Sequence, residues 1–127
     1  MSDLWNRKNY LMDIPFLIAS NIYEYDIQKA NINMLYSLGL ISKEYYDKLY
    51  NMNRMDRQVE IGYLLKYTEG LSDKLSDGIA LYRKKLFESN GLDDSDILSI
   101  KNDAIFVINK ILKTTEFDTV CFILKNS

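Results

Sequence analysis

The stretch from Asn21 to Leu38, NIYEYDIQKANINMLYSL, constrains the fold most, because its hydrophobic period changes within a few residues. Residues 22–27 alternate between two faces at each step, as a half-buried strand does. From residue 27 onward the apolar side chains share one helical face, and a glycine follows where a left-handed cap is expected: Ile27, Ala30, Met34, Leu38 and then Gly39. We therefore predict a strand that passes directly into a helix, with Asp26 at the change.

Three further helical segments follow. Ser42 is a good N-cap for one helix, and Asp56 can cap another that ends near Tyr67. The strongest helix is predicted for Leu71 to Asn90, where apolar residues recur at a spacing of three and four and Gly91 occupies the terminal position. The opposite face of this helix is charged, and we expect it to be solvated: it carries Asp73, Lys74, Asp77, Arg83, Lys84 and Glu88.

The last third of the chain has the composition of β-structure. Residues 97–100 and 104–109 are predicted to pair as a hairpin around the turn Lys101-Asn102-Asp103, since Asn and Asp tolerate the backbone angles of tight turns. Ile111 to Thr115 is expected to form another strand, Glu116 a turn, and Phe117 to Leu124 the closing strand. The order of elements predicts an α+β fold in one domain, residues 1–127. In it, a small antiparallel sheet combines one N-terminal strand with the C-terminal hairpin and strands, and about four inserted helices pack on one face.

Composition excludes several kinds of site. With no histidine, the chain lacks the commonest general base, and any metal has to be bound by oxygen ligands, as Mg²⁺, Mn²⁺ and Ca²⁺ are. The single cysteine, Cys121, rules out an internal disulfide and a zinc site with several thiolates. A formal net charge of -2 does not favour nucleic acid as a partner. No apolar run approaches a membrane span and the start lacks a signal-peptide core, so we expect a cytoplasmic protein without a membrane partner.

Two aspartates, Asp26 and Asp103, admit two interpretations each. Asp26 can cap the helix that follows it by accepting a backbone N–H bond, and Asp103 can be an ordinary turn residue. Taken together, they describe a strand that ends in Asp before a helix, and a later β-hairpin with Asp in its turn. The motifs EYDIQKANINML and SIKNDAIFVI thereby resemble the palm domain of nucleic-acid polymerases. The chain also resembles phage proteins of low-GC bacteria that carry the signatures EYDI-K-AN and SIK-DA-F.

The resemblance to a palm domain implies a two-metal site. Asp26 and Asp103 would be the catalytic carboxylates that bind Mg²⁺ or Mn²⁺, with Glu24 as a third ligand. Lys29 and Asn31 would lie near the sugar of an incoming nucleotide. A basic residue and a Gly-Tyr element would face its triphosphate, and the candidates are Arg57, Lys66, Gly62 and Tyr63. The chain departs from the family in having no thumb and little room for fingers, and Asn102 precedes Asp103 where a second carboxylate would add a ligand.

Two functions from different classes follow. The first is that of a small protein of a phage or mobile element with a truncated palm-like scaffold, which binds another protein, for instance as an inhibitor or decoy of a host enzyme. Such a protein would act in the host cytoplasm. Its ten tyrosines can supply an interface, since tyrosine is enriched at binding hot spots, or can lie partly buried with their hydroxyls at the rim of the core. The alternative is two-metal nucleotidyl or phosphoryl transfer that uses Asp26 and Asp103.

Overall fold

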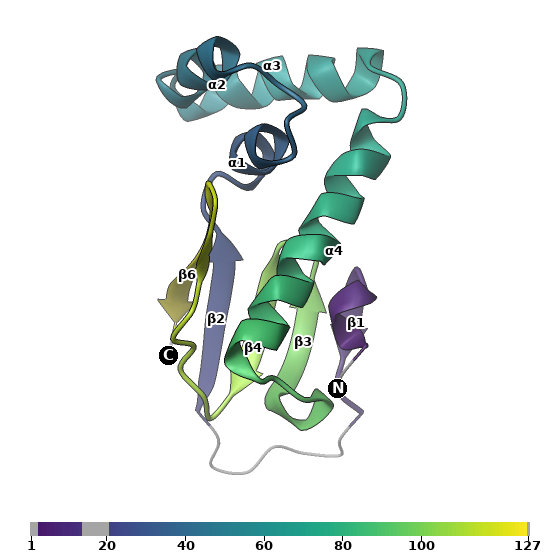
Figure 1. The fold of residues 1–127 in the computed structure, drawn as a ribbon, viewed down its shortest axis with the longest axis vertical. Helices are drawn as coiled ribbons and strands as arrows, with labels where there is room; N and C mark the ends of the chain where they lie inside the picture. Colours follow the sequence, from purple (N-terminus) through teal and green to yellow (C-terminus); the bar gives the residue numbers. More distant parts are fainter. Residues whose placement is uncertain (1–2, 14–20, 127) are drawn as a thin grey trace.

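The computed structural model describes residues 3–13 and 21–126, and it shows an α+β fold (Figure 1). Four α-helices accompany a six-stranded antiparallel sheet with the order β1-β3-β4-β2-β6-β5. The fold class predicted from the sequence is therefore confirmed. The expected break at Ile14-Pro15 and the lead-in at residues 16–18 lie outside the described residues. The elements are η1 (Leu4–Asn6), β1 (Asn9–Leu11), β2 (Ile22–Ile27), α1 (Ala30–Ser37), α2 (Lys43–Tyr50), α3 (Arg54–Tyr67), α4 (Leu71–Asn90), η2 (Asp94–Asp96), β3 (Ile97–Lys101), β4 (Ala104–Ile108), β5 (Glu116–Phe117) and β6 (Val120–Asn126).

Strand β2 lies in the middle of the sheet, between β4 and β6. The predicted hairpin is present as β3 and β4, and β4 pairs antiparallel with β2 so that Asp26 lies opposite Ala104. Along β2 the side chains of Tyr25 and Ile27 are buried against the helices, whereas Asp26 points to the other face and is partly exposed. The strand that opens the predicted motif is thus the centre of the sheet.

The expected strand over residues 111–115 is wrong, because this segment is a loop. Side chains bind its backbone amides instead of a neighbouring strand: Asn90 Oδ1 accepts from the amides of Lys113 and Thr114, and Tyr25 Oη accepts from the amide of Leu112. The turn predicted at Glu116 is also misplaced. Glu116 lies in β5, and the turn falls at residues 118–119, where Asp118 has a φ of 57°.

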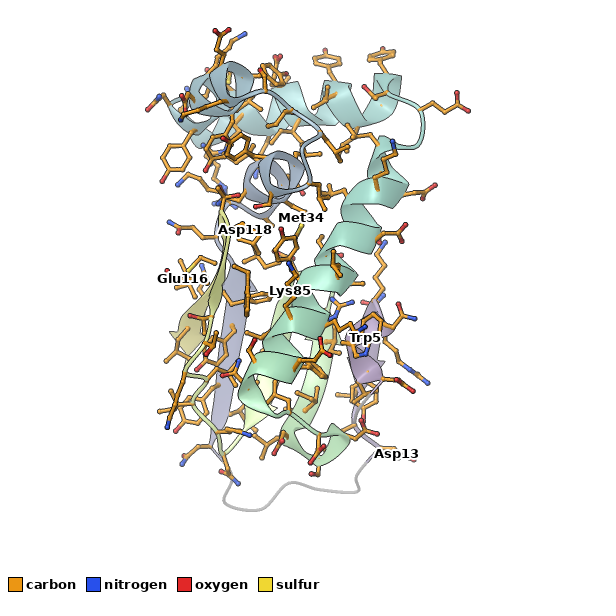
Figure 2. All side chains as sticks on the ribbon, in the orientation of Figure 1. Trp5, Asp13, Met34, Lys85, Glu116 and Asp118 are labelled. Carbon is orange, nitrogen blue, oxygen red and sulfur yellow. The ribbon has the colours of Figure 1, made fainter. Side chains whose placement is uncertain are left out.

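Helix α4 packs lengthwise on one face of the sheet, and α1, α2 and α3 form a separate layer beyond the strand ends (Figure 1). Only α4 therefore lies along the face that was expected to carry all four helices. The main core joins α4 to the sheet, and Met34 of α1 is fully buried at the top of this core (Figure 2). A smaller cluster under α2 and α3 contains Ile32, Leu49 and Ile61. No helix among the described residues is long and apolar enough to cross a membrane.

Helix boundaries follow the predicted caps with two corrections. Ser42 accepts a hydrogen bond from the amide of Tyr45, as its role as N-cap requires. Helix α3 begins at Arg54, one turn earlier than predicted, because the side chain of Asn53 accepts the amide of Asp56 and is the cap. The positive φ angles of Gly39 and Gly91 confirm these two glycines at helix ends, and Gly70, which also has a positive φ, is the N-cap of α4.

The capping interpretation of Asp26 is also wrong. Asp26 lies inside β2, and α1 begins only at Ala30, after the turn residues Gln28 and Lys29. Lys29 occupies the cap position with a φ of 42° and no side-chain cap bond. Asn33 of α1 supports this turn instead, since its side-chain amide donates to the carbonyl oxygen of Gln28 at 2.6 Å. The carboxylate of Asp26 is therefore not used by the helix that follows it.

The expectation of a solvated charged face on α4 is wrong for Arg83, which is only 4% exposed. Its guanidinium donates to three backbone carbonyl oxygens, those of Trp5 at 2.7 Å, Arg7 at 2.7 Å and Asn102 at 2.6 Å. Burial lowers the pKa of Arg83 to about 10, so the side chain remains a cation at neutral pH. Arg83 thereby ties the N-terminal segment, which Figure 2 shows at Trp5 beside α4, to the tip of the β3–β4 hairpin.

Candidate functional site

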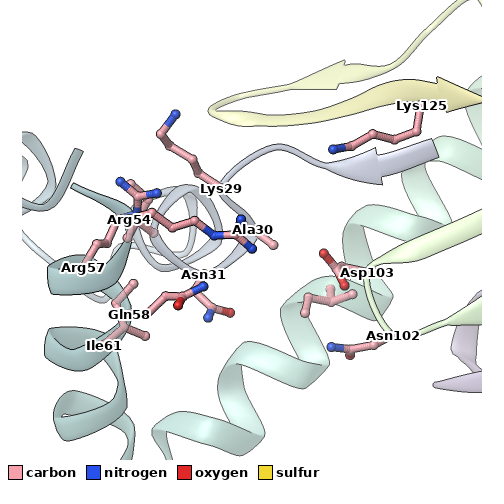
Figure 3. Close-up of a pocket in the computed structure, with 12 residues that line it drawn as sticks. Lys29, Ala30, Asn31, Arg54, Arg57, Gln58, Ile61, Asn102, Asp103 and Lys125 are labelled. Carbon is pink, nitrogen blue, oxygen red and sulfur yellow. The ribbon is translucent and has the colours of Figure 1, made fainter. Parts of the chain in front are cut away.

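A pocket of about 470 Å³ opens where the sheet meets the helical layer (Figure 3). The β2–α1 turn and the first turn of α1 form one side, α3 a second, and the hairpin tip and the end of β6 the others. The side chains come from segments far apart in the chain, so only the fold assembles this space. The lining residues are Lys29, Ala30, Asn31, Ile32, Arg54, Arg57, Gln58, Ile61, Ile79, Asn102, Asp103 and Lys125.

Carboxylates gather beside the pocket, where Asp103 is part of the lining. The pairing of β2 with β4 places the hairpin tip beside the end of β2, and the amide of Ile27 donates to the carbonyl oxygen of Asp103 at 3.4 Å. Glu24 stands two residues before Asp26 and therefore on the same face of β2. The structure thus brings together Asp26 and Asp103, the two aspartates that the sequence singled out, and Glu24 beside them.

Asp26 is the electrostatically perturbed member of this group. Burial raises the pKa of its carboxyl above 3.8, and the negative charges of Glu24 and Asp103 and a side-chain hydrogen bond with Glu24 raise it further, against an opposing effect of Lys125. Its Oδ1 atom is buried and has no hydrogen-bond partner within residues 3–13 and 21–126. A buried carboxylate oxygen without a partner is costly unless a cation or donor satisfies it. The atom is therefore suited to a ligand that supplies positive charge.

Basic side chains occupy the other walls. Of the described residues that line the pocket, four are Lys or Arg and one is Asp. Arg54 and Arg57 extend from the first turn of α3, and Arg57 is steadied by a hydrogen bond from Nη1 to the carbonyl oxygen of Met52 at 3.1 Å. The ammonium of Lys29 lies 4.8 Å from the ring centre of Tyr50. Figure 3 shows α3 and the start of α1 on one side of this space, with Asp103 and Lys125 on the other.

Arg83 determines where the hairpin tip lies. Its Nη1 donates to the carbonyl oxygen of Asn102, the residue before Asp103, and Asn102 adopts a φ of 55° in the turn. A cation buried on α4 therefore holds the backbone next to one carboxylate of the pocket. Arg83 touches the site only through this backbone, so it is a positioning residue.

Some of the site residues predicted from the sequence lie at the pocket, and others lie elsewhere on α3. Lys29, Asn31, Arg57 and Asp103 line the pocket, and Asp26 lies next to Asp103. Tyr63 and Lys66 do not line it; both are exposed further along α3. Sequence reasoning missed Arg54 and Lys125. Arg54 stands three residues before Arg57 on one helix, and that spacing could have indicated it. Lys125 has no local signal, because only the pairing of β6 with β2 brings it to the pocket.

The donor set fits a hard divalent cation bound together with phosphate. Within residues 3–13 and 21–126 there is no group of three or more Cys, Asp or Glu side chains placed to hold a metal alone. Mg²⁺ usually binds to one or two carboxylates and completes its shell with water and substrate phosphates. Asp26 and Asp103 can supply the carboxylates, and the neighbouring Lys and Arg side chains can neutralise the phosphates.

A comparison with protein-family models matches almost the whole chain. Residues 1–126 match the family model described as Bacteriophage PBS1 gene 130 protein. No curated protein and no solved structure matches the chain significantly.

Proposed function

The chain belongs to the bacteriophage PBS1 gene 130 protein family, and we propose that it binds the phosphate groups of a nucleotide together with Mg²⁺ at the pocket beside Asp26 and Asp103. The activity that this arrangement serves is nucleotidyl or phosphoryl transfer on a palm-like scaffold. One observation carries the proposal: four basic side chains from three separate segments converge on a pocket whose far wall holds Asp103, next to an unsatisfied oxygen of Asp26.

The order of the strands supports this proposal. In a polymerase palm, a strand that ends in Asp leads into a helix, and a hairpin with Asp at its tip lies beside that strand. Here β2 carries Asp26 and leads into α1, and β4 of the Asp103 hairpin pairs with β2. The strand face that carries Asp26 is opposite the face that packs against α4.

The basic residues and the carboxylates would bind different parts of the ligand. The guanidinium groups of Arg54 and Arg57 can each donate two hydrogen bonds to phosphate oxygens, and Lys29 and Lys125 add charge without a fixed geometry. Mg²⁺, when bound, would supply the charge that Asp26 and Asp103 attract and would bridge them to the phosphates. The pKa of Asp26 is raised first by burial and second by repulsion from Glu24 and Asp103, and such a cation would relieve the repulsion.

Calorimetric titration with a deoxynucleoside triphosphate, in the presence and absence of Mg²⁺, tests the proposal. Arg57→Gln is expected to weaken triphosphate binding about tenfold or more, the effect of losing one charged hydrogen bond. Lys66→Gln removes the same charge from the same helix outside the pocket and is expected to change binding less than about twofold. Asp26→Asn and Asp103→Asn are expected to abolish the dependence on Mg²⁺. Equal losses in Arg57→Gln and Lys66→Gln, or no binding at millimolar nucleotide, would refute the proposed site.

Binding of another protein, as an inhibitor or decoy of a host enzyme, is the second candidate function. The observation in its favour is an apolar hollow of about 550 Å³ along β1 and β3, where Leu11 is 73% exposed and Leu98 and Phe106 form part of the lining. A photocrosslinker at Leu11 should then capture one host enzyme that the purified chain also inhibits, and a crosslinker at exposed Glu88 should not. The same captures from both positions, or a captured enzyme that the chain leaves fully active, would refute this function.

A further inference from the structure

Helix α3 exposes a row of large apolar side chains that the phosphate pocket does not use. Met55 is 74% exposed, Val59 54%, Tyr63 58% and Tyr67 72%. The four residues are spaced by four, so they form one ridge along the helix. The inner side of α3, with Ile61 and Leu65, packs on the small cluster under α2, and α3 forms the outer edge of the helical layer (Figure 1). The ridge therefore faces away from the molecule.

Gly62 lies within this exposed side of α3, and no contact among residues 3–13 and 21–126 explains why it is a glycine. A Cβ built at Gly62 would meet no atom within 4 Å, and Gly62 is not among the glycines with positive φ. A glycine in the interior of a helix costs about 1 kcal/mol relative to alanine. By contrast, Gly78 of α4 is explained by a contact, because a Cβ there would lie 2.5 Å from Leu38 Cδ1 and this side chain would have to move. A notch beside Val59 and Tyr63 suits the close approach of another helix.

The charges on the same helix indicate which helix approaches. Asp56 lies in the first turn of α3 and Lys66 in the last, at similar distances on either side of Ile61. Arg54 and Arg57, also in the first turn, point to the pocket on another side of the helix. When two copies of α3 cross antiparallel with their midpoints level with Ile61, Asp56 of each copy comes near Lys66 of the other. The same arrangement places Val59 near Gly62 and Tyr63 of the second copy. The surface is therefore complementary to itself, as a two-fold symmetric interface has to be.

We propose that two copies of this chain associate through their α3 helices, antiparallel, with the ridge Met55–Val59–Tyr63–Tyr67 and the notch at Gly62 at the centre. The ridge exposes on the order of 500 Å² per copy, taking roughly 200 Å² for each large side chain. About 1,000 Å² in total is near the lower limit of specific interfaces, so the dimer is weak and forms at micromolar to millimolar concentration. Arg57 and Ile61 of the pocket lie on the side of α3 away from the ridge, whereas Gln58, which also lines the pocket, stands one turn before Gly62 and borders the interface. This inference does not rest on nucleotide binding.

Sedimentation equilibrium of the full chain over a range of concentrations tests the proposal. Val59→Glu is expected to weaken dimerisation at least tenfold, since it buries a charge at the centre of the interface. Gly62→Gln is expected to stabilise the monomer against urea and to weaken the dimer as well, a combination that damage to the fold cannot produce. The control is Glu88→Lys, at an exposed position of α4, and it should leave the association constant unchanged. A monomer at about 1 mM, or a dimer that Val59→Glu leaves intact, would overturn the proposal.

A charge-reversal pair tests the antiparallel arrangement. Asp56→Lys and Lys66→Asp should each weaken self-association, because each variant brings like charges together at both ends of the interface. An equimolar mixture of the two variants should form a heterodimer, since every end then pairs opposite charges. A mixture that associates no better than its components contradicts the arrangement. Single-stranded oligonucleotide that binds at Tyr63 and Tyr67, without association of the chain, would identify the ridge as a stacking surface and overturn the dimer.

Discussion

Replacing Arg83 by methionine removes a buried positive charge that donates hydrogen bonds to three backbone carbonyl oxygens. Methionine keeps the length and the apolar stem of the side chain but has no donor. The carbonyl oxygens of Trp5, Arg7 and Asn102 then lose hydrogen bonds of 2.6 to 2.7 Å. Because Arg83 is 4% exposed, water replaces these bonds poorly.

The magnitude follows from those three bonds. A buried acceptor left without a partner costs roughly 1–3 kcal/mol, and the removal of a buried, desolvated charge returns part of that cost. We expect Arg83→Met to lower the free energy of unfolding by about 3 kcal/mol. Most domains have only 5–15 kcal/mol in all. Arg83→Lys keeps the charge but not the planar fork, and a loss of about 1–2 kcal/mol is expected.

Urea denaturation followed by circular dichroism measures both losses. Lys84→Met is the matched control, because the neighbouring Lys84 is half-buried with its ammonium 5.0 Å from the ring centre of Trp5 and makes no such set of bonds. Its loss should stay below about 1 kcal/mol. A loss below 1 kcal/mol for Arg83→Met, or one equal to that of Lys84→Met, would refute the reasoning. If the Arg83→Lys variant binds Mg²⁺ more weakly than the original chain under conditions in which both are fully folded, Arg83 also positions Asp103.

Three further outcomes follow. The pKa of Asp26 is raised above 3.8, so the folded state holds that proton more tightly than the unfolded chain does; the contribution of Asp26 to stability is complete below pH 3.8 and is lost as the pH rises through its folded pKa. Asp26→Asn should therefore raise the urea midpoint at pH 7, and this advantage should disappear in acid. Gly78→Ala forces the side chain of Leu38 to move and should lower the free energy of unfolding by about 1 kcal/mol, although alanine has the better helix propensity; thermal unfolding measures this loss. Tyr25→Phe leaves the buried amide of Leu112 without its acceptor and should cost about 1–2 kcal/mol, with faster hydrogen exchange at residues 112–114.

Prediction from sequence succeeded where the signal was local. The change of period at residues 21–38 identified β2 and α1, and the glycines at 39 and 91 marked helix ends because few other residues accept a positive φ. It failed where a distant group decided the outcome. Residues 111–115 have the composition of a strand, but Asn90 and Tyr25 bind their amides, so they form a loop. Asp26 looked like a cap, but β2 continues through it to pair with β4.

The candidate site shows the same division. The sequence by itself determined β2, the helices and the β3–β4 hairpin, but not β1 or the loop at residues 111–115. It also singled out Asp26 and Asp103 through their places near a strand end and in a hairpin turn. Only the tertiary structure decided that Lys125 joins Lys29 and the arginines of α3 around one pocket, because strand pairing acts between residues about 100 positions apart. It also decided that Arg83 is buried. Helical periodicity places Arg83 on a polar face, but the carbonyls of Trp5, Arg7 and Asn102 meet there and require a donor.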